Sequence, residues 1–183
     1  MDKIGIFYGT EKGMTAAMAQ VMYRVLGDEI ADEPVNVNRA TVPGLLQYKA
    51  LILGVPSYGV GELPGRTTGS DEGNWEEFLF RLDEADLSGK RIALFGLGNQ
   101  QKYYDRFASS LIHLYQYVRA YGAEVIGDWS TDGYHFTRSH SVIDNRFVGL
   151  VLDHHNQPEM TKDRIITWLG QVKPGLLEKL AHA

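Results

Sequence analysis

Residues 9–15 read Gly9-Thr10-Glu11-Lys12-Gly13-Met14-Thr15, directly after the apolar run Ile4-Gly5-Ile6-Phe7-Tyr8. This pattern predicts a strand that ends in a turn rich in glycine and hydroxyl groups, from which a helix begins. Such a junction points backbone N–H groups and the positive end of a helix dipole at one spot, which suits a phosphate. Thr10 and Thr15 can add hydroxyl donors, and Gly13 lets the backbone approach closely. An ordinary threonine-capped strand–turn–helix junction has the same pattern. This segment alone therefore does not show whether a phosphate binds here.

Further apolar runs predict the sheet to which this first strand belongs. They lack the polar–apolar alternation of half-exposed strands, which is typical of buried parallel strands. We expect such strands at residues 3–8, 50–55, 91–98 and 124–126, with a short one at residues 34–37. Helical stretches lie between them, and this alternation of strand and helix predicts a doubly wound parallel α/β fold.

Apolar residues at helical spacing place three of the helices. The first has a broad apolar face between Ala17 and Leu26, and Gly27 follows as a stop signal. Another has apolar residues at helical spacing over residues 107–121. The last is expected to be capped by Thr161 and to be kinked or ended by Pro174-Gly175.

A polar segment interrupts the alternation near its end. Residues 128–146 are rich in Ser, Thr, Asp, Gly and His, and they lie between apolar residues near Val125 and the run Phe147–Leu152. A long polar stretch of this kind inside a compact domain is typical of an insertion. We expect it to split or follow the last strand, at about residues 128–147.

Length and composition restrict the class of protein. A chain of 183 residues, 44% hydrophobic and 22% charged, fits one globular domain, which we expect to cover residues 1–183. No apolar run is long enough to span a membrane, and Met1 leads into a charged pair rather than a secretory signal, so we expect a cytoplasmic protein. The absence of cysteine excludes disulfides, a cysteine nucleophile and cysteine-ligated metal centres. Electron transfer would therefore need another cofactor.

Negative charge is concentrated in one part of the chain. The formal net charge is −5, and Arg81 is the one basic residue among the seven acidic residues of segment 71–86. An acidic surface argues against nucleic acid as a partner and favours a basic protein. The plainer interpretation of such a charge run is a solvated helix face.

Three loops predict a ligand site, because ligands of open α/β sheets bind beyond the carboxyl ends of the strands. They are residues 9–15, residues 56–65 and residues 96–105. The second and third loops each carry an aromatic residue among glycines, including Tyr58 and Tyr103. Two aromatic rings beside a phosphate cradle suit a flat heteroaromatic ring with a phosphate tail.

Taken together, these segments resemble the long-chain flavodoxins from one end of the chain to the other. The matching motifs are Thr10-Glu11-x-Gly13-x-Thr15, Leu53-Gly54-x-Pro56 with Gly61-Glu62-Leu63, Phe95-Gly96-Leu97-Gly98-x-Gln100, Trp129-Ser130-Thr131-Asp132-Gly133-Tyr134 and Phe147-Val148-Gly149-Leu150. Within the family the chain is most similar to the flavodoxins that feed nitrogenase. This narrower resemblance is carried by Asn36-Val37-Asn38-Arg39, by residues 59–65 and by Trp75-Glu76-Glu77-Phe78-Leu79.

The resemblance implies a flavodoxin-like three-layer sandwich around a five-stranded parallel sheet of order 2-1-3-4-5, with an insertion in the last strand. It implies one non-covalent FMN and no enzymatic turnover. The expected function is low-potential one-electron transfer, cycling between semiquinone and hydroquinone, from an upstream reductase to the nitrogenase iron protein. A monomer is expected, with an acidic docking face near Glu62, Asp71 and Glu72, and neither membrane nor nucleic acid as a partner.

Carried over by position, the resemblance also implies the cofactor-binding residues. Tyr58 would cover one face of the flavin ring, Tyr103 would stack on the other, and Gly59 falls where the family flips a peptide on reduction. The phosphate would be cradled by Thr10, Glu11, Lys12, Gly13, Met14 and Thr15. The backbone that would meet the pyrimidine edge belongs to Leu97, Gly98, Asn99 and Gln100. The remaining expected contacts are Pro56, Ser57 and Gly61, and no metal ligand is expected.

Several positions depart from the family pattern. Lys12 replaces a threonine of the phosphate loop, and it points either into solvent or at the phosphate. Met14 replaces a polar residue, and Arg106 a neutral polar one. Asn99 stands where many relatives carry aspartate, which should ease reduction to the anionic hydroquinone. Tyr58 is often tryptophan in this family, and it either covers the ring or turns outward.

Other interpretations stay open at this point. An FMN-dependent NAD(P)H:quinone reductase would share the fold, although the insertion and the acidic segment fit a carrier better. A phosphoacceptor signalling domain would need acidic residues where Phe7-Tyr8 and Val55-Pro56 stand. His154-His155 could suggest a metal site, but adjacent side chains point apart and no carboxylate spacing supports one, so we expect both at the surface.

Overall fold

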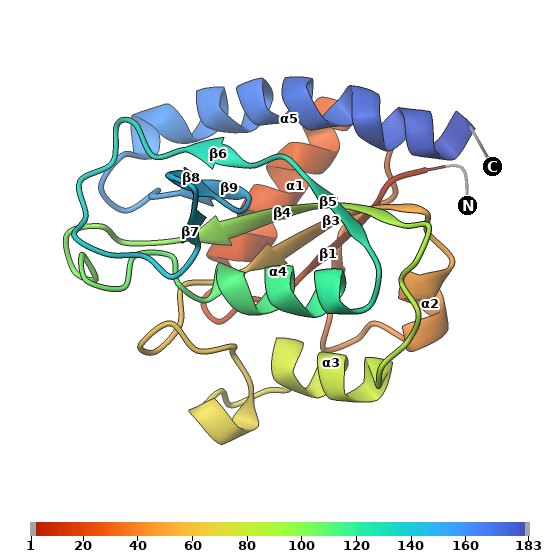
Figure 1. The fold of residues 1–183 in the computed structure, drawn as a ribbon, viewed down its shortest axis with the longest axis horizontal. Helices are drawn as coiled ribbons and strands as arrows, with labels where there is room; N and C mark the ends of the chain where they lie inside the picture. Colours follow the sequence, from red (N-terminus) through yellow and green to blue (C-terminus); the bar gives the residue numbers. More distant parts are fainter. Residues whose placement is uncertain (1–2, 182–183) are drawn as a thin grey trace.

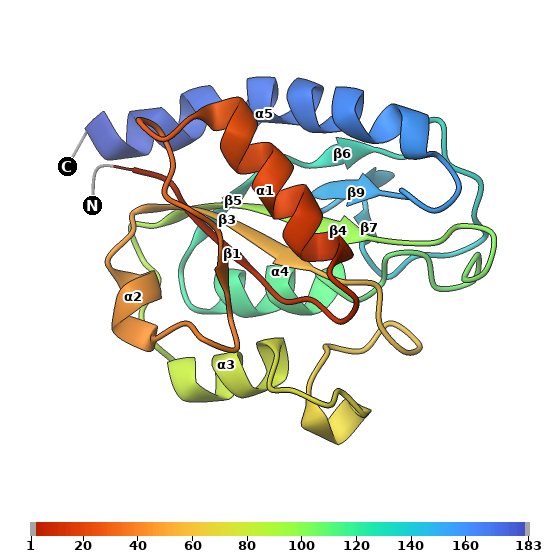
Figure 2. The same ribbon diagram turned by 180° about the vertical axis from the view of Figure 1, so that it is seen from behind.

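The fold was analysed in a computed structural model that describes residues 3–181. The first two and last two residues lie outside the described residues, and with them Met1, on which the expected absence of a secretory signal rested. The two views in Figures 1 and 2 show one layered body with a central sheet and helices on both faces.

The central sheet has the predicted parallel order β2-β1-β3-β4-β5, and β9 also pairs with β4. All of these pairs are parallel, which confirms the fold class. The strands are β1 (Gly5–Tyr8), β2 (Val35–Asn36), β3 (Ala50–Val55), β4 (Arg91–Leu97), β5 (Glu124–Ile126) and β9 (Leu150–Leu152).

The polar insertion splits the last strand, as expected. β5 pairs with the first half of β4, where Ala93 lies opposite Ile126, and β9 pairs with the second half, where Phe95 lies opposite Leu150. The chain between them forms a small antiparallel sheet of order β6-β8-β7, made by β6 (Trp129–Ser130), β7 (Val142–Ile143) and β8 (Arg146–Phe147).

Helices cover both faces of the central sheet. In Figures 1 and 2, α1 and α5 lie on one side of it, and α3 and α4 lie on the other, with α2 at one end. Their bounds are α1 (Met14–Leu26), α2 (Val42–Leu46), α3 (Trp75–Leu82), α4 (Leu111–Ala120) and α5 (Pro158–Ala181), and a short 3-10 turn, η1, covers Arg66–Thr68.

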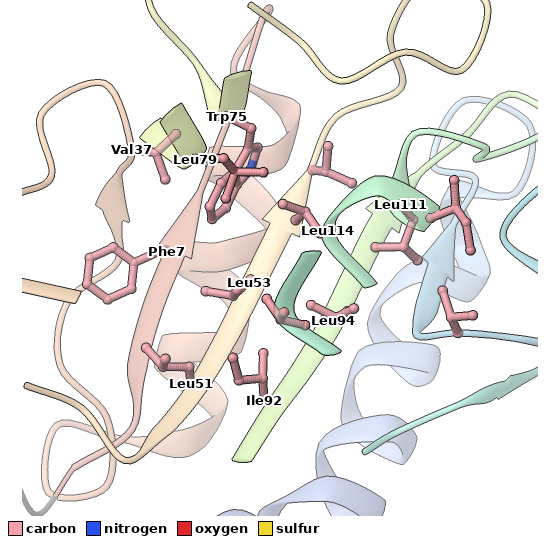
Figure 3. Packing of buried hydrophobic residues seen from close by; sticks show 14 of the residues in the cluster. Phe7, Val37, Leu51, Leu53, Trp75, Leu79, Ile92, Leu94, Leu111 and Leu114 are labelled. Atoms are coloured by element: carbon pink, nitrogen blue, oxygen red, sulfur yellow. The ribbon is translucent and has the colours of Figure 1, made fainter. Parts of the chain in front are cut away.

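Each face of the sheet has its own apolar core, because successive side chains of a strand point to opposite faces. Leu51 and Leu53 pack toward α3 and α4, as Figure 3 shows, whereas Ile52 belongs to the cluster under α1 and α5. Both clusters contain fully buried residues, including Trp75 on the first face and Trp168 on the second. This packing fixes the carboxyl ends of the strands, where the three predicted loops begin.

The expected start of the last helix was wrong, and of the two outcomes expected at Pro174-Gly175, a kink or an end, the structure contradicts the end. Helix α5 begins at Pro158, and Thr161 lies inside it. Proline suits the first turn of a helix, because the N–H it lacks would have no partner there. The helix also continues past Pro174 to Ala181. Val172 and Leu176 are buried on either side of this proline, and their packing offsets the lost hydrogen bond.

Other element bounds also differ from the prediction. Helix α4 begins at Leu111 rather than near Phe107, because Ala108 has a φ of 50° and Phe107 N donates to Arg138 O at 3.0 Å. Helix α2 was not predicted, although Thr41 caps it by accepting from Gly44 N at 3.1 Å. The strands expected at 3–8, 34–37 and 91–98 are shorter in the structure.

Candidate functional site

A cavity of about 630 Å³ lies where the loops after β1, β3 and β4 meet. The loop after β9 contributes to it as well, so the site is at the carboxyl edge of the sheet where the fold class predicts a ligand. The residues that line it are Thr10, Glu11, Lys12, Met14, Thr15, Pro56, Ser57, Tyr58, Gly59, Leu97, Gly98, Asn99, Tyr103, His154 and His155. Gly13, Gly61 and Gln100, which were also expected to bind the cofactor, do not line it.

The loop before α1 forms a cradle with unused donors. Gly13 precedes the helix with a φ of 85°, and its N–H donates to Thr10 Oγ1 at 3.0 Å. Backbone N–H groups of the first helical turn have no acceptor within the helix. Thr15 is 1% exposed, and its hydroxyl has no hydrogen-bond partner among the described residues. A buried hydroxyl without a partner, at the wall of a cavity, is the kind of group that a bound anion satisfies.

The cradle is braced from the segment before α3. Asn74 Nδ2 donates to Thr10 O and to Glu11 Oε1, both at 3.1 Å, and Ser70 Oγ donates to Glu11 Oε1 at 2.6 Å. A side chain at Gly9 would place its Cβ 2.0 Å from Asn74 Oδ1, so a glycine is required there. The Glu11 carboxylate lines the cavity, and these donors hold it in place. It shapes the cradle and keeps its negative charge.

The loop after β3 presents Tyr58 through a tight turn. Gly59 and Gly61 have φ values of 50° and 97°, and Gly61 N donates to Tyr58 O at 3.0 Å. Gly61 therefore shapes the turn instead of lining the cavity. The Tyr58 hydroxyl donates to Thr68 O at 2.8 Å, which anchors the ring while it lines the cavity. This geometry favours the covering orientation over the outward one.

The electrostatics around Tyr58 are negative. Its pKa is raised by burial first, the hydrogen bond to Thr68 opposes the shift, and the charges of Glu11, Glu62 and Asp71 add to it. Three carboxylates therefore act on this wall of the cavity. A negative field of this kind disfavours further negative charge beside Tyr58.

The loop after β4 presents Tyr103 on the lining of the same cavity. Lys102 Nζ and Arg106 Cζ lie 5.2 and 5.0 Å from the centre of its ring, which is the range of cation–π contacts. Asn99 Oδ1 accepts from Lys102 N and from Asn156 Nδ2, both at 2.9 Å. These contacts hold the loop in place.

Gln100 is directed into the protein rather than into the cavity. Its backbone N–H donates to Asp153 Oδ2 at 2.9 Å, and its side-chain oxygen accepts from His135 N at 2.5 Å. The side chain is 4% exposed. Gln100 therefore joins the loop after β4 to the insertion and to the loop after β9.

His154 and His155 are the site residues that the sequence interpretation did not assign. His155 is exposed and His154 is half-buried, as a surface location requires, but both line the cavity. Their place directly after β9 was the signal, because the carboxyl end of every strand in a parallel sheet meets the same edge. No group of three or more His, Asp or Glu side chains within residues 3–181 is arranged to hold a metal ion.

Comparison with known proteins places the chain in a family. The family model described as flavodoxin matches residues 6–168. This chain belongs to the flavodoxin family. A Klebsiella pneumoniae flavodoxin is 45% identical over 177 residues, which cover 97% of this chain and all of that protein, and an Enterobacter agglomerans flavodoxin is 47% identical over 178 residues with the same coverage. A Fusobacterium nucleatum flavodoxin solved with bound FMN is 32% identical, with a TM-score of 0.82 over 94% of this chain and 98% of that one.

Family membership shows whether the chain is an electron carrier or an enzyme. Flavodoxins are FMN-binding electron-transfer proteins and not enzymes, so the quinone reductase alternative is not supported. The residues present also fit FMN. The partnerless Thr15 hydroxyl and the first turn of α1 suit a phosphate, and Tyr58 and Tyr103 are the two aromatic rings on the cavity lining. Within residues 3–181, no helix is long and apolar enough to cross a membrane.

Proposed function

We propose that this flavodoxin holds FMN in the cavity described above and carries one electron at a time. The observation that carries the proposal is the buried, partnerless Thr15 hydroxyl at the wall of a cavity that two tyrosines also line. When bound, FMN supplies the redox chemistry, because its ring accepts and releases single electrons. The protein binds the phosphate at residues 10–15 and positions the ring between Tyr58 and Tyr103.

The proposed potential is low, with cycling between the semiquinone and hydroquinone. Support comes from the carboxylates of Glu11, Glu62 and Asp71, whose charges act on Tyr58. Their field opposes the negative charge that the second electron brings, and a low local dielectric strengthens that opposition. Gly59 already has a φ of 50°, and a glycine changes its backbone conformation there at little cost.

The proposed redox partners are basic proteins that dock beside Tyr58. Glu62, Asp71 and Glu72 are exposed. Val60, on the same loop as Glu62, is 61% exposed, so it offers a partner an apolar side chain close to these acidic residues. Complementary charge of this kind speeds the encounter of two proteins. The nitrogenase iron protein as acceptor, with an upstream reductase as donor, is supported by the resemblance of residues 36–39, 59–65 and 75–79. The cytoplasmic location and the monomeric state remain predictions.

The cofactor site is tested by Thr15→Val, which keeps the shape of the side chain and removes the hydroxyl. Since this hydroxyl has no hydrogen-bond partner within residues 3–181, the variant apoprotein should unfold at the same or a higher urea concentration than the wild type. Its dissociation constant for FMN should rise by about tenfold, the loss of one hydrogen bond to a charged group. Thr167→Val, an exposed threonine on α5, is the matched control. Unchanged FMN affinity in Thr15→Val would contradict the proposed phosphate site.

The acceptor is tested by electron delivery. The photoreduced protein is mixed with nitrogenase iron protein, and the rate of electron transfer is followed at increasing salt concentration. We expect transfer that slows as salt rises, and that slows further in Glu62→Gln and Asp71→Asn at low salt. A rate that does not depend on salt would reject the acidic docking face, and absence of transfer would reject this acceptor.

A further inference from the structure

The loop after β9 brings two histidines to the cavity beside the phosphate cradle. His154 and His155 line it together with Thr10, Lys12 and Thr15. His154 also lines an apolar groove between α1 and α5 that contains Met18, one turn into α1 from the cradle. We propose that these two histidines form a proton-dependent part of the phosphate site, so that protonation of either ring tightens binding of the anionic cofactor. This proposal rests on the proposed function, because it takes FMN as the ligand of the cavity.

A buried hydrogen-bond network holds this loop in place. Asp153 is 1% exposed, and its carboxylate accepts from Gln100 N at 2.9 Å and from Asn156 N at 3.1 Å. Asn156 Nδ2 donates to Asn99 Oδ1 at 2.9 Å, which ties the loop to the one after β4. The two histidines between Asp153 and Asn156 are thus presented by a fixed backbone. Their closeness to the cavity is a property of the fold rather than of a free loop.

The hydrogen bonds of His154 indicate where its charge appears. Thr161 Oγ1 lies 3.0 Å from His154 Nδ1 and 3.5 Å from Gln157 O. If the hydroxyl donates to that carbonyl, it accepts from Nδ1–H, which leaves Nε2 as the nitrogen that gains a proton. His155 is exposed. Histidine as a residue type changes charge between about pH 5 and 8, which sets the pH range of the test.

Two carboxylates and three cations face the histidines. The carboxylates of Glu11 and Asp153 accept from neutral donors of the protein and keep their negative charge. Tyr58 and Tyr103 line the same cavity. The remaining facing groups are cations, and they are Lys12 in the cradle, Arg24 on α1 and Lys162 on α5. The three cations outnumber the two carboxylates, and each protonated histidine adds to this excess of positive charge. A phosphate is the anion that the neighbouring cradle accommodates.

The expected effect is a pH-dependent gain in affinity. At a separation of about 10 Å and an effective dielectric of about 40, one added positive charge should tighten binding of a phosphate roughly three- to tenfold. The phosphate itself takes up a proton near pH 6, which weakens its binding at low pH and has to be separated from the histidine effect. The ratio of dissociation constants between variant and wild type removes this common contribution.

The test is FMN binding to apoprotein, measured by quenching of flavin fluorescence between pH 5.5 and 8.5 at low salt. His155→Gln is the main variant, because this side chain is exposed. The ratio of its dissociation constant to that of the wild type should be near one at pH 8.5 and should reach roughly three- to tenfold at pH 5.5. His155→Lys, which keeps its charge, should bind more tightly than the wild type at pH 8.5. His140→Gln, an exposed histidine outside the cavity, is the matched control and should leave the ratio at one.

His154→Gln extends the test to the half-buried ring, with circular dichroism and urea unfolding of the apoprotein to check that α5 stays folded. Riboflavin, which lacks the phosphate, should show no pH-dependent ratio in either variant. A ratio that stays flat from pH 5.5 to 8.5 in both variants, or an equal pH effect on riboflavin, would overturn the proposal while FMN binding itself stands. If the wild-type protein fails to bind FMN at every pH, the proposed function itself is wrong.

Discussion

Ser70 Oγ donates a 2.6 Å hydrogen bond to the Glu11 carboxylate, and so joins the phosphate cradle to a segment 59 residues further along the chain. Asn74 adds two bonds from the same segment, to Thr10 O and to Glu11. The cradle is therefore shaped by contacts within the protein itself. Such preorganisation lowers the ordering cost of binding.

The brace can be removed at Asn74. This residue is 3% exposed, accepts from Trp75 N at 2.9 Å as the cap of α3, and donates to the cradle. Asn74→Ala should lower the free energy of unfolding by about 1–2 kcal/mol, the usual cost of losing a helix cap, and should weaken FMN binding as well. Urea unfolding and FMN titration measure the two effects. Ser70→Ala should show a smaller loss of both. Unchanged FMN affinity in Asn74→Ala would mean that the brace does not shape the cradle.

Lys12 offers a test of charge in the cradle. It is exposed and lines the cavity, where its ammonium can reach a bound phosphate. Lys12→Thr should weaken FMN binding, with a gap to the wild type that widens as the salt concentration is lowered, because salt screens exposed charges. FMN titrations from 10 mM to about 500 mM salt measure it. If the gap is the same at every salt concentration, Lys12 points into solvent.

Asn99 sets the charge on the loop after β4. Its Oδ1 accepts from Lys102 N and Asn156 Nδ2, two bonds that an aspartate oxygen would also accept. Asn99→Asp should therefore keep the loop and add one negative charge. At about 10 Å and an effective dielectric of about 40, the potential of the second one-electron step should fall by about 35 mV. Anaerobic potentiometric titration measures it, and a potential that is unchanged or higher contradicts the prediction.

Tyr134 links the insertion to the sheet, and we expect it to make the stability of the fold depend on pH in the alkaline range. Its hydroxyl donates to Val151 O at 2.5 Å and accepts from Trp129 Nε1 at 3.0 Å, and burial raises the pKa of Tyr134 to about 12. Because the folded protein holds the phenol proton more tightly than the unfolded chain does, Tyr134 adds to the free energy of unfolding. This contribution is complete below pH 10 and is lost as the pH rises through 12. A shift from 10 to about 12 corresponds to at most about 2–3 kcal/mol.

Tyr134→Phe separates this contribution from others. At pH 7 the variant should be about 1 kcal/mol less stable, because Val151 O and Trp129 Nε1 lose their partner. At pH 11.5 the difference should shrink or reverse, since the variant has no phenol to ionise. Urea unfolding at pH 7, 9 and 11.5 measures the change. A difference that is constant with pH would show that Tyr134 does not titrate on unfolding.

The sequence predicts the sheet and the three loops of the site because both depend on local patterns. A buried apolar run and a glycine-rich turn can be recognised without knowing what packs on them, as in the segment ending at Thr15. The brace from Asn74 could not be predicted, since it joins residues 64 positions apart and depends on how α3 packs. The cavity lining by His154 could have been predicted, because this residue follows the end of a strand at the same edge of the sheet. The start of α5 could have been predicted from Pro158, whereas its passage through Pro174 depends on tertiary packing of Val172 and Leu176.

The central claim is that this chain carries single electrons on FMN. It is tested most directly by absorption spectra of the FMN-loaded protein during stepwise anaerobic reduction. The account predicts a yellow protein that passes through the blue, one-electron-reduced flavin, with an absorption band at long wavelength, before it bleaches. A yellow protein that bleaches with no band of a one-electron-reduced flavin, blue or red, would contradict one-electron carriage, and a protein that takes up no FMN would contradict the site itself.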